Sequence, residues 1–227
     1  MPNEKFRYPE DMPQGFRSPK EYGLLYEDVY ITTKDNVKLH AWFIKAGKNP
    51  KHFRTLIFFH GNAGNIGSRL PNLHLLINSL SVNILILAYR GYGHSEGKPS
   101  EDGLKLDADA TLEYLLTERD DIDKERIFVF GRSLGGAVAT QLAISKPEGV
   151  NGIIVENTFT SLSDMVDALL PFLTPFKFLV QRIFYPTVDK IGKVKCPILF
   201  IRGLRDEIVP CQQSLVLYDK AKNARFK

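Results

Sequence analysis

The apolar positions of this sequence fall into short continuous runs that are separated by longer amphipathic stretches. Five runs of strand length lie at 55–59, 83–88, 126–130, 152–155 and 197–201. None of them alternates apolar with polar residues, which is typical of strands covered on both faces in a parallel sheet. Two earlier strands, at 28–33 and 37–44, are joined by the turn-forming Lys34-Asp35-Asn36, and they predict an antiparallel hairpin.

Helical periodicity occupies the stretches between these runs. We expect helices near 70–80, 100–117, 135–145, 161–172 and 211–221. An antiparallel start followed by alternating strands and helices predicts an α/β fold with a mostly parallel, doubly wound sheet. Such a sheet builds its site from the loops at the carboxyl ends of its strands, so we expect the functional residues in those loops.

Composition narrows the class of protein but not its activity. The chain has 227 residues, 44% of them hydrophobic and 25% charged, which excludes a disordered chain and fits one globular domain. A net charge of +4, from 30 basic and 26 acidic residues, gives no cationic stripe, so we expect no nucleic-acid partner. The only cysteines, Cys196 and Cys211, predict neither a disulfide framework nor a metal site.

No segment of the sequence has the pattern of a secretory signal or of a membrane-spanning helix. The first 19 residues are polar and contain proline. The most apolar stretch, 168–180, is 13 residues long and is interrupted by Pro171, Pro175 and Lys177. A bilayer-spanning helix needs about 20 apolar residues. From these residues alone we expect the chain as given to be soluble or peripheral to a membrane.

The strongest chemical motif is Gly131-Arg132-Ser133-Leu134-Gly135, a G-x-S-x-G pattern between a strand and a helix. A nucleophilic serine needs a very sharp strand-to-helix turn that exposes its hydroxyl, and Gly131 and Gly135 relieve the crowding that this turn creates. The alternative is an ordinary glycine-rich turn of a nucleotide-binding fold. Because no G-x-G-x-x-G or Walker pattern follows the first parallel strand, we predict that Ser133 is a nucleophile.

A second loop, His60-Gly61-Asn62-Ala63-Gly64-Asn65, follows the strand at 55–59. Its small residues let a backbone N–H approach a substrate, and we predict that Asn62 and Leu134 donate the two N–H groups of an oxyanion hole. His60 is a candidate base and a candidate site-lining residue, but a hydrogen bond that organises the loop is the favoured reading. The segment 89–95 follows the next strand, and its Tyr92 either packs in a scaffold or lines the site.

Together these motifs resemble the alpha/beta-hydrolase superfamily, and within it the Bem46-like serine hydrolases. The resemblance rests on the nucleophile turn, on 60–67, on 89–95 and on Glu156-Asn157-Thr158-Phe159, and it runs from about Tyr26 to the end of the chain. It implies an N-terminal extension, 1–25, before a hydrolase domain at 26–227, and a Ser-Asp-His triad that uses no cofactor. It also implies association with a membrane, which family members achieve through an N-terminal helix that this sequence does not show.

In the resembled family the loop after the strand at 197–201 supplies the triad carboxylate, and Asp206 matches that position. Glu207 is the fallback carboxylate, and a capping or turn-stabilising role for Asp206 is the alternative. The family order places the histidine after the acid, yet all five histidines here precede Ser133: His40, His52, His60, His74 and His94.

We therefore expect that a C-terminal strand, the histidine loop and a closing helix are missing from this chain. Three explanations are open. The chain is a fragment of an active hydrolase, it is a pseudoenzyme that serves as a binding module, or an upstream histidine such as His60 or His94 replaces the base.

The substrate is the least defined part of the prediction. Residues 157–195 form either a cap over the site or a helical excursion that packs into the core, and 168–180 can accept an acyl chain or contact a membrane surface. We expect a small-molecule or acylated substrate, and hydrolysis of esters or thioesters of acyl lipids or acylated proteins. A serine aminopeptidase-like peptidase is the alternative activity. The residues do not predict an oligomeric state.

Overall fold

The computed structural model of the chain describes residues 6–169 and 184–226. They form one eight-stranded sheet with the order β1-β2-β4-β3-β5-β6-β7-β8. β1 (Leu25–Thr32) and β2 (Lys38–Lys45) make the expected hairpin, and β2 is also antiparallel to β4 (Val82–Leu87). The remaining strands are parallel: β3 (Arg54–Phe59), β5 (Ile127–Arg132), β6 (Gly152–Glu156), β7 (Ile198–Ile201) and β8 (Ala224–Phe226). The predicted fold class, a mostly parallel α/β-hydrolase sheet with an antiparallel start, is confirmed.

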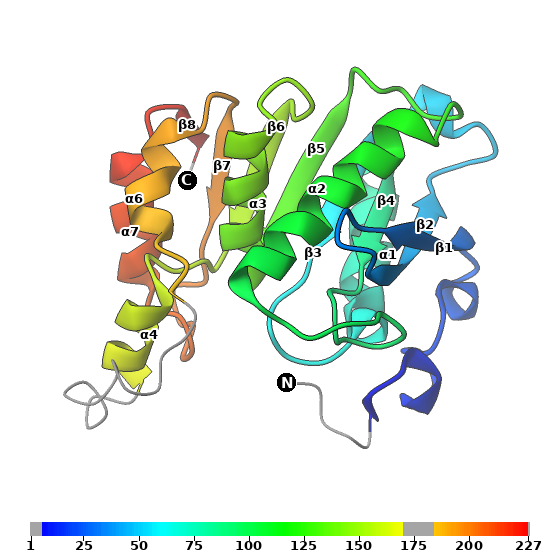
Figure 1. Cartoon of the computed structure of the whole chain (residues 1–227), viewed down its shortest axis with the longest axis horizontal. Coiled ribbons are helices and arrows are strands. Elements are labelled where there is room, and N and C mark those ends of the chain that lie inside the picture. The colour runs from blue at the N-terminus through cyan, green and yellow to red at the C-terminus, as the bar shows by residue number, and fades with distance from the viewer. Residues whose placement is uncertain (1–5, 170–183, 227) are drawn as a thin grey trace.

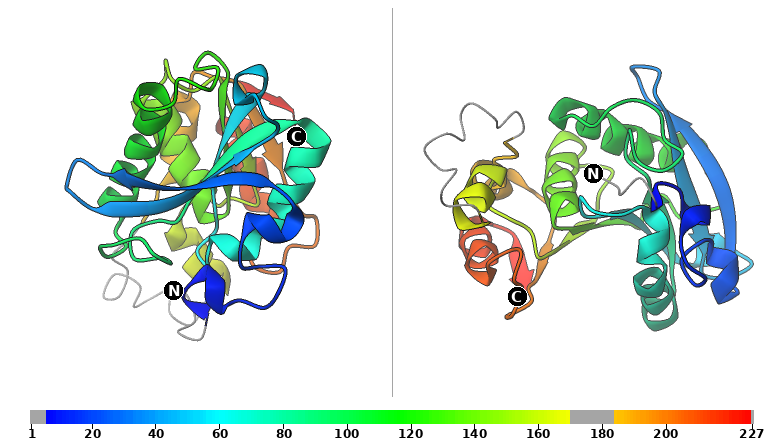
Figure 2. Two further views of the ribbon diagram at one scale, coloured as in Figure 1. Left: turned by 90° about the vertical axis from the view of Figure 1, so that its right-hand side faces the viewer. Right: turned by 90° about the horizontal axis from the view of Figure 1, so that it is seen from below.

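In the described ranges the five longer helices are α1 (Leu70–Leu80), α2 (Glu101–Thr117), α3 (Leu134–Ser145), α4 (Leu162–Leu169) and α7 (Cys211–Lys220). The short α6 is Thr187–Lys190. Short 3-10 helices are η2 (Pro9–Asp11), η3 (Pro19–Tyr22), η4 (Pro50–His52), η5 (Ile66–Arg69) and η7 (Ile191–Lys193). α1 and α2 lie on opposite faces of the sheet (Figures 1 and 2).

The uninterrupted apolar runs are explained by the two layers of core. Along β3, Ile57 and Phe59 belong to one buried cluster, which includes residues of α2 and α3. Leu56 and Phe58 belong to the other, which includes residues of α1. Because successive side chains of a strand point to opposite faces, a strand covered on both faces needs no polar position.

The structure corrects one detail of the expected C-terminal end. We expected no strand after 197–201, but β8 (Ala224–Phe226) lies parallel to β7. It is only three residues long and contains no β-branched residue, so the sequence pattern gave no strand signal. Its pairing with β7 is a long-range contact that a local pattern does not reveal.

The segment before β1 packs against loops and helices beside the sheet. Pro9 and Pro19 are buried, and the ring of Tyr8 stacks on His94 with centroids 4.7 Å apart. Residues 6–22 lie beside the start of α1 (Figure 2), where the ring of Tyr22 is 4.9 Å from that of His74. The boundary between an extension and the domain at residue 25 stays a prediction.

Candidate active site

Ser133 occupies a strained turn between β5 and α3. Its φ of 53° and ψ of −116° are unusual for a residue with a side chain, and such strain persists only where the surroundings hold the backbone in place. The Ser133 N–H donates to the carbonyl of Glu156 at 2.9 Å, and the Thr158 hydroxyl donates to the carbonyl of Ser133 at 3.0 Å. Both neighbours come from β6 and the loop after it, so the adjacent strand fixes the turn.

The two glycines that flank Ser133 are required by close backbone contacts. A Cβ on Gly135 would lie 1.9 Å from the carbonyl oxygen of Phe59, and a Cβ on Gly131 would lie 2.2 Å from the carbonyl oxygen of Gly135. No side chain fits at either distance. The turn therefore brings the start of α3 directly against the end of β3, where the loop that begins at His60 leaves the sheet.

That loop has its carbonyl groups held by side chains. Four successive carbonyl oxygens accept hydrogen bonds. The Tyr89 hydroxyl donates to His60 O at 3.0 Å, and the His60 Nδ1 donates to Gly61 O at 2.7 Å. The Tyr92 hydroxyl donates to Asn62 O at 3.0 Å, and the Arg69 guanidinium donates to Ala63 O. In a planar trans peptide the N–H points away from the carbonyl that precedes it. Fixing these oxygens therefore also fixes the direction of each following N–H group.

His60 has the role in the loop that the sequence favoured. It is fully buried, and burial lowers the pKa of its imidazole to about 3. Because its Nδ1 bonds the carbonyl oxygen of Gly61, that nitrogen carries the proton, and the bond orients the peptide that ends in the Asn62 N–H. A fully buried imidazole with so low a pKa is a weak proton acceptor, and the contact shown here is within the loop.

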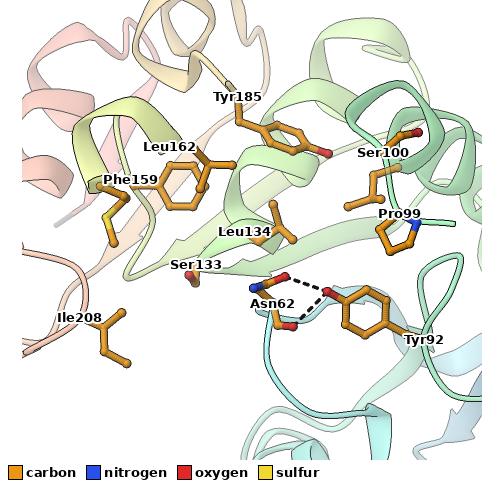
Figure 3. A pocket seen from close by; sticks show the side chains of 12 residues that line it. Asn62, Tyr92, Pro99, Ser100, Ser133, Leu134, Phe159, Leu162, Tyr185 and Ile208 are labelled. Atoms are coloured by element: carbon orange, nitrogen blue, oxygen red, sulfur yellow. Dashed lines mark hydrogen bonds between the residues drawn. The ribbon is translucent and has the colours of Figure 1, made fainter. Parts of the chain in front are cut away.

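Tyr92 combines the two readings that the sequence left open. Its hydroxyl contacts both the carbonyl oxygen of Asn62, at 3.0 Å, and the Asn62 side-chain Oδ1, at 2.7 Å (Figure 3). The ring also lines a cavity together with Ser133. Tyr92 is thus both part of the scaffold and part of the site.

Asp206 lies on the loop between β7 and α7. Its Oδ1 accepts from the backbone N–H groups of Ile208 at 2.8 Å and Val209 at 2.9 Å, so the turn-stabilising role considered above is present. Asp206 also lines a cavity that contains Ser133, together with the exposed Glu207. One carboxylate oxygen is used by the turn, and the other has no hydrogen-bond partner among the described residues.

Two cavities meet at Ser133. The first has a volume of about 370 Å³ and is walled mainly by apolar side chains. Its lining residues are Asn62, Tyr92, Pro99, Ser100, Leu104, Ser133, Leu134, Phe159, Leu162, Met165, Tyr185 and Ile208 (Figure 3). We call it the apolar cavity.

The second cavity, also of about 370 Å³, lies on the Asp206 side and is more polar. Its lining residues are Arg132, Ser133, Asn157, Arg205, Asp206, Glu207, Ile208 and Val209. We call it the polar cavity. The structure thus brings together Asn62, Leu134 and Tyr92 around Ser133 on one side, and Asp206 and Glu207 on the other.

None of the five histidines lines either cavity in the described part of the chain. Four of them are engaged elsewhere: His40 with Asp28, His94 with Glu10, His52 with Asn49 and His74 with Asn78. Two residues hold the loop and the turn in ways that the sequence did not predict. Arg69 belongs to no motif, and Thr158 stands in the motif 156–159 without any sign of its contact with Ser133. The partners of both are fixed only by the fold.

The segment 168–180 lies outside the described residues, except for the last two positions of α4. The same holds for the middle of the predicted cap at 157–195, of which α4, α6 and η7 are described. No helix in the described ranges has both the length and the apolar character needed to cross a bilayer.

This geometry agrees with what comparison with known proteins finds. The family model described as alpha/beta hydrolase fold matches residues 54–188. The alpha/beta hydrolase domain-containing protein WAV2 of Arabidopsis thaliana is 46% identical over 215 residues, covering 90% of this chain and 69% of that protein. The chain belongs to the alpha/beta hydrolase family.

Other relatives of this alpha/beta hydrolase extend the match. Protein bem46 of Schizosaccharomyces pombe is 39% identical over 225 residues, covering 97% of this chain and 75% of that protein. A Saccharomyces cerevisiae relative, 36% identical over 212 residues, is named an uncharacterized membrane protein. The esterase Pf2001 of Pyrococcus furiosus superposes with a TM-score of 0.73 at 25% identity, over 92% of this chain and 84% of that one. These neighbours support hydrolase activity for the alpha/beta hydrolase described here.

Proposed function

We propose that this alpha/beta hydrolase cleaves carboxylic esters or thioesters through an acyl-enzyme on Ser133. The observation that carries the proposal is the strained Ser133 turn, which sits between the loop of Asn62 and the first turn of α3. An ordinary glycine-rich turn has no need of φ 53° at a serine, nor of glycines pressed to 1.9 Å and 2.2 Å against backbone.

In the proposed reaction the Ser133 hydroxyl oxygen attacks the carbonyl carbon while a base takes its proton. The tetrahedral oxyanion is stabilised by the N–H groups of Asn62 and Leu134, and by the positive end of α3. Collapse expels the alcohol or thiol, which takes the proton from the base, and leaves an acyl group on Ser133. Water then attacks the acyl-enzyme by the same route and releases the carboxylic acid.

The proposed acid of the triad is Asp206, which orients an imidazole and stabilises its protonated form. Because none of the five histidines lines either cavity at Ser133 in the described part of the chain, we propose that the imidazole is not one of the five histidines of this sequence. A serine hydrolase without its histidine keeps only the contribution of substrate binding and the oxyanion hole, about 10³ to 10⁴-fold over water.

The test uses added imidazole as the base. The full chain is assayed for hydrolysis of p-nitrophenyl acetate with and without imidazole, and the imidazole-only rate is subtracted. We expect a saturable, imidazole-dependent rate that Ser133→Ala removes and that Ser163→Ala, a half-buried serine on α4, leaves intact. If the chain is folded and Ser133→Ala has the same rate as the unmodified chain, the proposed nucleophile is wrong. The binding-module alternative would then be favoured.

Contact with a membrane surface through 168–180 stays a prediction. The name of the yeast relative is consistent with membrane association, but that name describes the yeast protein.

A further inference from the structure

The two cavities at Ser133 differ in a way that assigns the two halves of the substrate. We infer that the apolar cavity binds a medium-chain acyl group and that the polar cavity holds the alcohol or thiol that leaves. This inference rests on the proposed function, because the assignment uses the direction in which the leaving group must depart.

The direction follows from proton transfer. The base that takes the proton of Ser133 must lie between Ser133 and the carboxylate of Asp206, and the same group later donates that proton to the leaving oxygen or sulfur. The leaving group must therefore face the base, on the Asp206 side of Ser133. Of the two cavities Asp206 lines only the polar one, so the base and the leaving group share the polar cavity and the acyl group extends to the other side of Ser133.

The walls of the two cavities fit this division. The apolar cavity passes from Ser133 along Leu134 and under the ring of Tyr185 toward Pro99 and Ser100 (Figure 3). Burying a carbon chain against such apolar walls raises its affinity about threefold to fourfold for each methylene. The polar cavity instead presents the charged side chains of Arg205 and Glu207, which suit a hydrated alcohol.

The size of the apolar cavity limits the chain. Its volume of about 370 Å³ is near the lower end of ligand pockets in general. A cavity of this size holds an acyl chain of limited length, so we expect the gain per methylene to stop by dodecanoate. Ser100, the N-cap residue of α2, and Leu104, in its first turn, line this cavity, and Ser100 lies on the side away from Ser133 (Figure 3).

An equilibrium measurement tests the acyl half without catalysis. The dissociation constants of butanoate, hexanoate, octanoate, decanoate and dodecanoate are measured by calorimetry on the full chain carrying Ser133→Ala. We expect the affinity to rise about two-hundredfold from butanoate to octanoate, which is four methylenes, and to level off by dodecanoate. Ser100→Phe should bring the plateau to a shorter chain, and Leu104→Ala should move it to a longer one.

Urea unfolding midpoints show which variants are folded. If Leu104→Ala does not fold, Ser100→Phe still decides the test, because Ser100 is exposed and its substitution should not disturb the core. Arg205→Trp, on the exposed rim of the polar cavity, is the matched control and should leave the dependence of carboxylate affinity on chain length unchanged. In the unmodified chain assayed with imidazole, Arg205→Trp should instead lower hydrolysis of 1-naphthyl octanoate about tenfold relative to methyl octanoate.

Affinities that do not depend on chain length, or that keep rising through dodecanoate, would overturn the acyl assignment. If Arg205→Trp changes the dependence of carboxylate affinity on chain length and Ser100→Phe does not, the assignment of the two cavities is reversed. If the carboxylates bind as expected and no ester is hydrolysed, the cavity binds acyl chains and the proposed function is what fails. If esters are hydrolysed and carboxylate affinity does not depend on chain length, the proposed function holds and the acyl assignment is what fails.

Discussion

The hydroxyl of Tyr92 offers a direct test of how the loop around Asn62 is held. It bonds the carbonyl oxygen of Asn62 at 3.0 Å and its Oδ1 at 2.7 Å, while Asn62 itself is exposed. Tyr92→Phe removes both contacts and keeps the ring in the wall of the apolar cavity. Because Asn62 is the proposed donor to the oxyanion, its freedom to move should weaken stabilisation of the transition state more than binding of the substrate.

The size of this effect can be bracketed from the contacts. A hydroxyl has one proton, so the two oxygens share one neutral hydrogen bond, which contributes about 1 kcal/mol. Lost entirely from the transition state, that amount slows the reaction about fivefold. Complete loss of one oxyanion donor costs about 10² to 10³-fold and sets the upper limit. We expect kcat to fall about five- to fiftyfold with KM changed less than about twofold.

Tyr185→Phe is the matched control for this measurement. Tyr185 lines the same cavity, but its buried hydroxyl has no hydrogen-bond partner among the described residues. Its removal should leave kcat unchanged and leave the free energy of unfolding unchanged or raised by up to about 1 kcal/mol. The kinetics are measured with p-nitrophenyl acetate and imidazole, and stability by urea unfolding. Equal effects of the two substitutions on kcat, or a Tyr92→Phe effect on KM alone, would refute the reasoning.

Three further predictions concern stability, each measured by urea unfolding. Gly135→Ala places a Cβ 1.9 Å from a backbone oxygen and should destabilise the fold by about 3 kcal/mol or more. As its control, Gly203→Ala places a Cβ 3.5 Å from the nearest atom and should change stability by less than about 0.5 kcal/mol. Similar losses of stability in the two variants would contradict the tight turn at Ser133. Burial holds the pKa of His60 near 3 in the folded state, below the unfolded value of about 6.5, so the unfolded chain takes up the proton first as pH falls. Stability should then decline by about 1.4 kcal/mol per pH unit below pH ~6.5, and His60→Gln should flatten that slope; parallel slopes would show that another group is responsible. Asp107→Ala removes the buried carboxylate that accepts hydrogen bonds from the Arg90 backbone N–H at 2.9 Å and from its Nε at 2.8 Å. The free energy of unfolding should fall by about 3 kcal/mol or more, and a fall of less than about 1 kcal/mol would contradict the prediction.

Much of the fold was predictable because burial on both faces leaves a plain signal. The run at 55–59 has no polar alternation since Leu56 and Phe58 face one core cluster while Ile57 and Phe59 face the other. The turn at Ser133 was predictable because its steric demand requires glycine at fixed positions, and the contacts of Gly131 and Gly135 confirm that demand. Patterns of this kind are local, so a single sequence displays them.

The parts that escaped prediction depend on contacts distant in sequence. A Cβ on Gly67 would lie 2.0 Å from the carbonyl oxygen of Phe16, and the Asn65 side chain donates to the carbonyl oxygen of Phe6 at 3.0 Å. No periodic pattern in the sequence indicates that residues 6–22 pack against the loop that carries Asn62. Arg69 was likewise missed, because its bond to the carbonyl oxygen of Ala63 arises only once η5 turns back on the loop.

The measurement closest to the central claim is covalent labelling of Ser133. The full chain is treated with a fluorophosphonate probe in the presence of imidazole, digested, and analysed by mass spectrometry. We predict one phosphonyl adduct on the peptide that contains Ser133, absent from Ser133→Ala and present in Ser163→Ala. A folded chain that carries no adduct, or carries it at another residue, would contradict the assignment of Ser133 as the nucleophile.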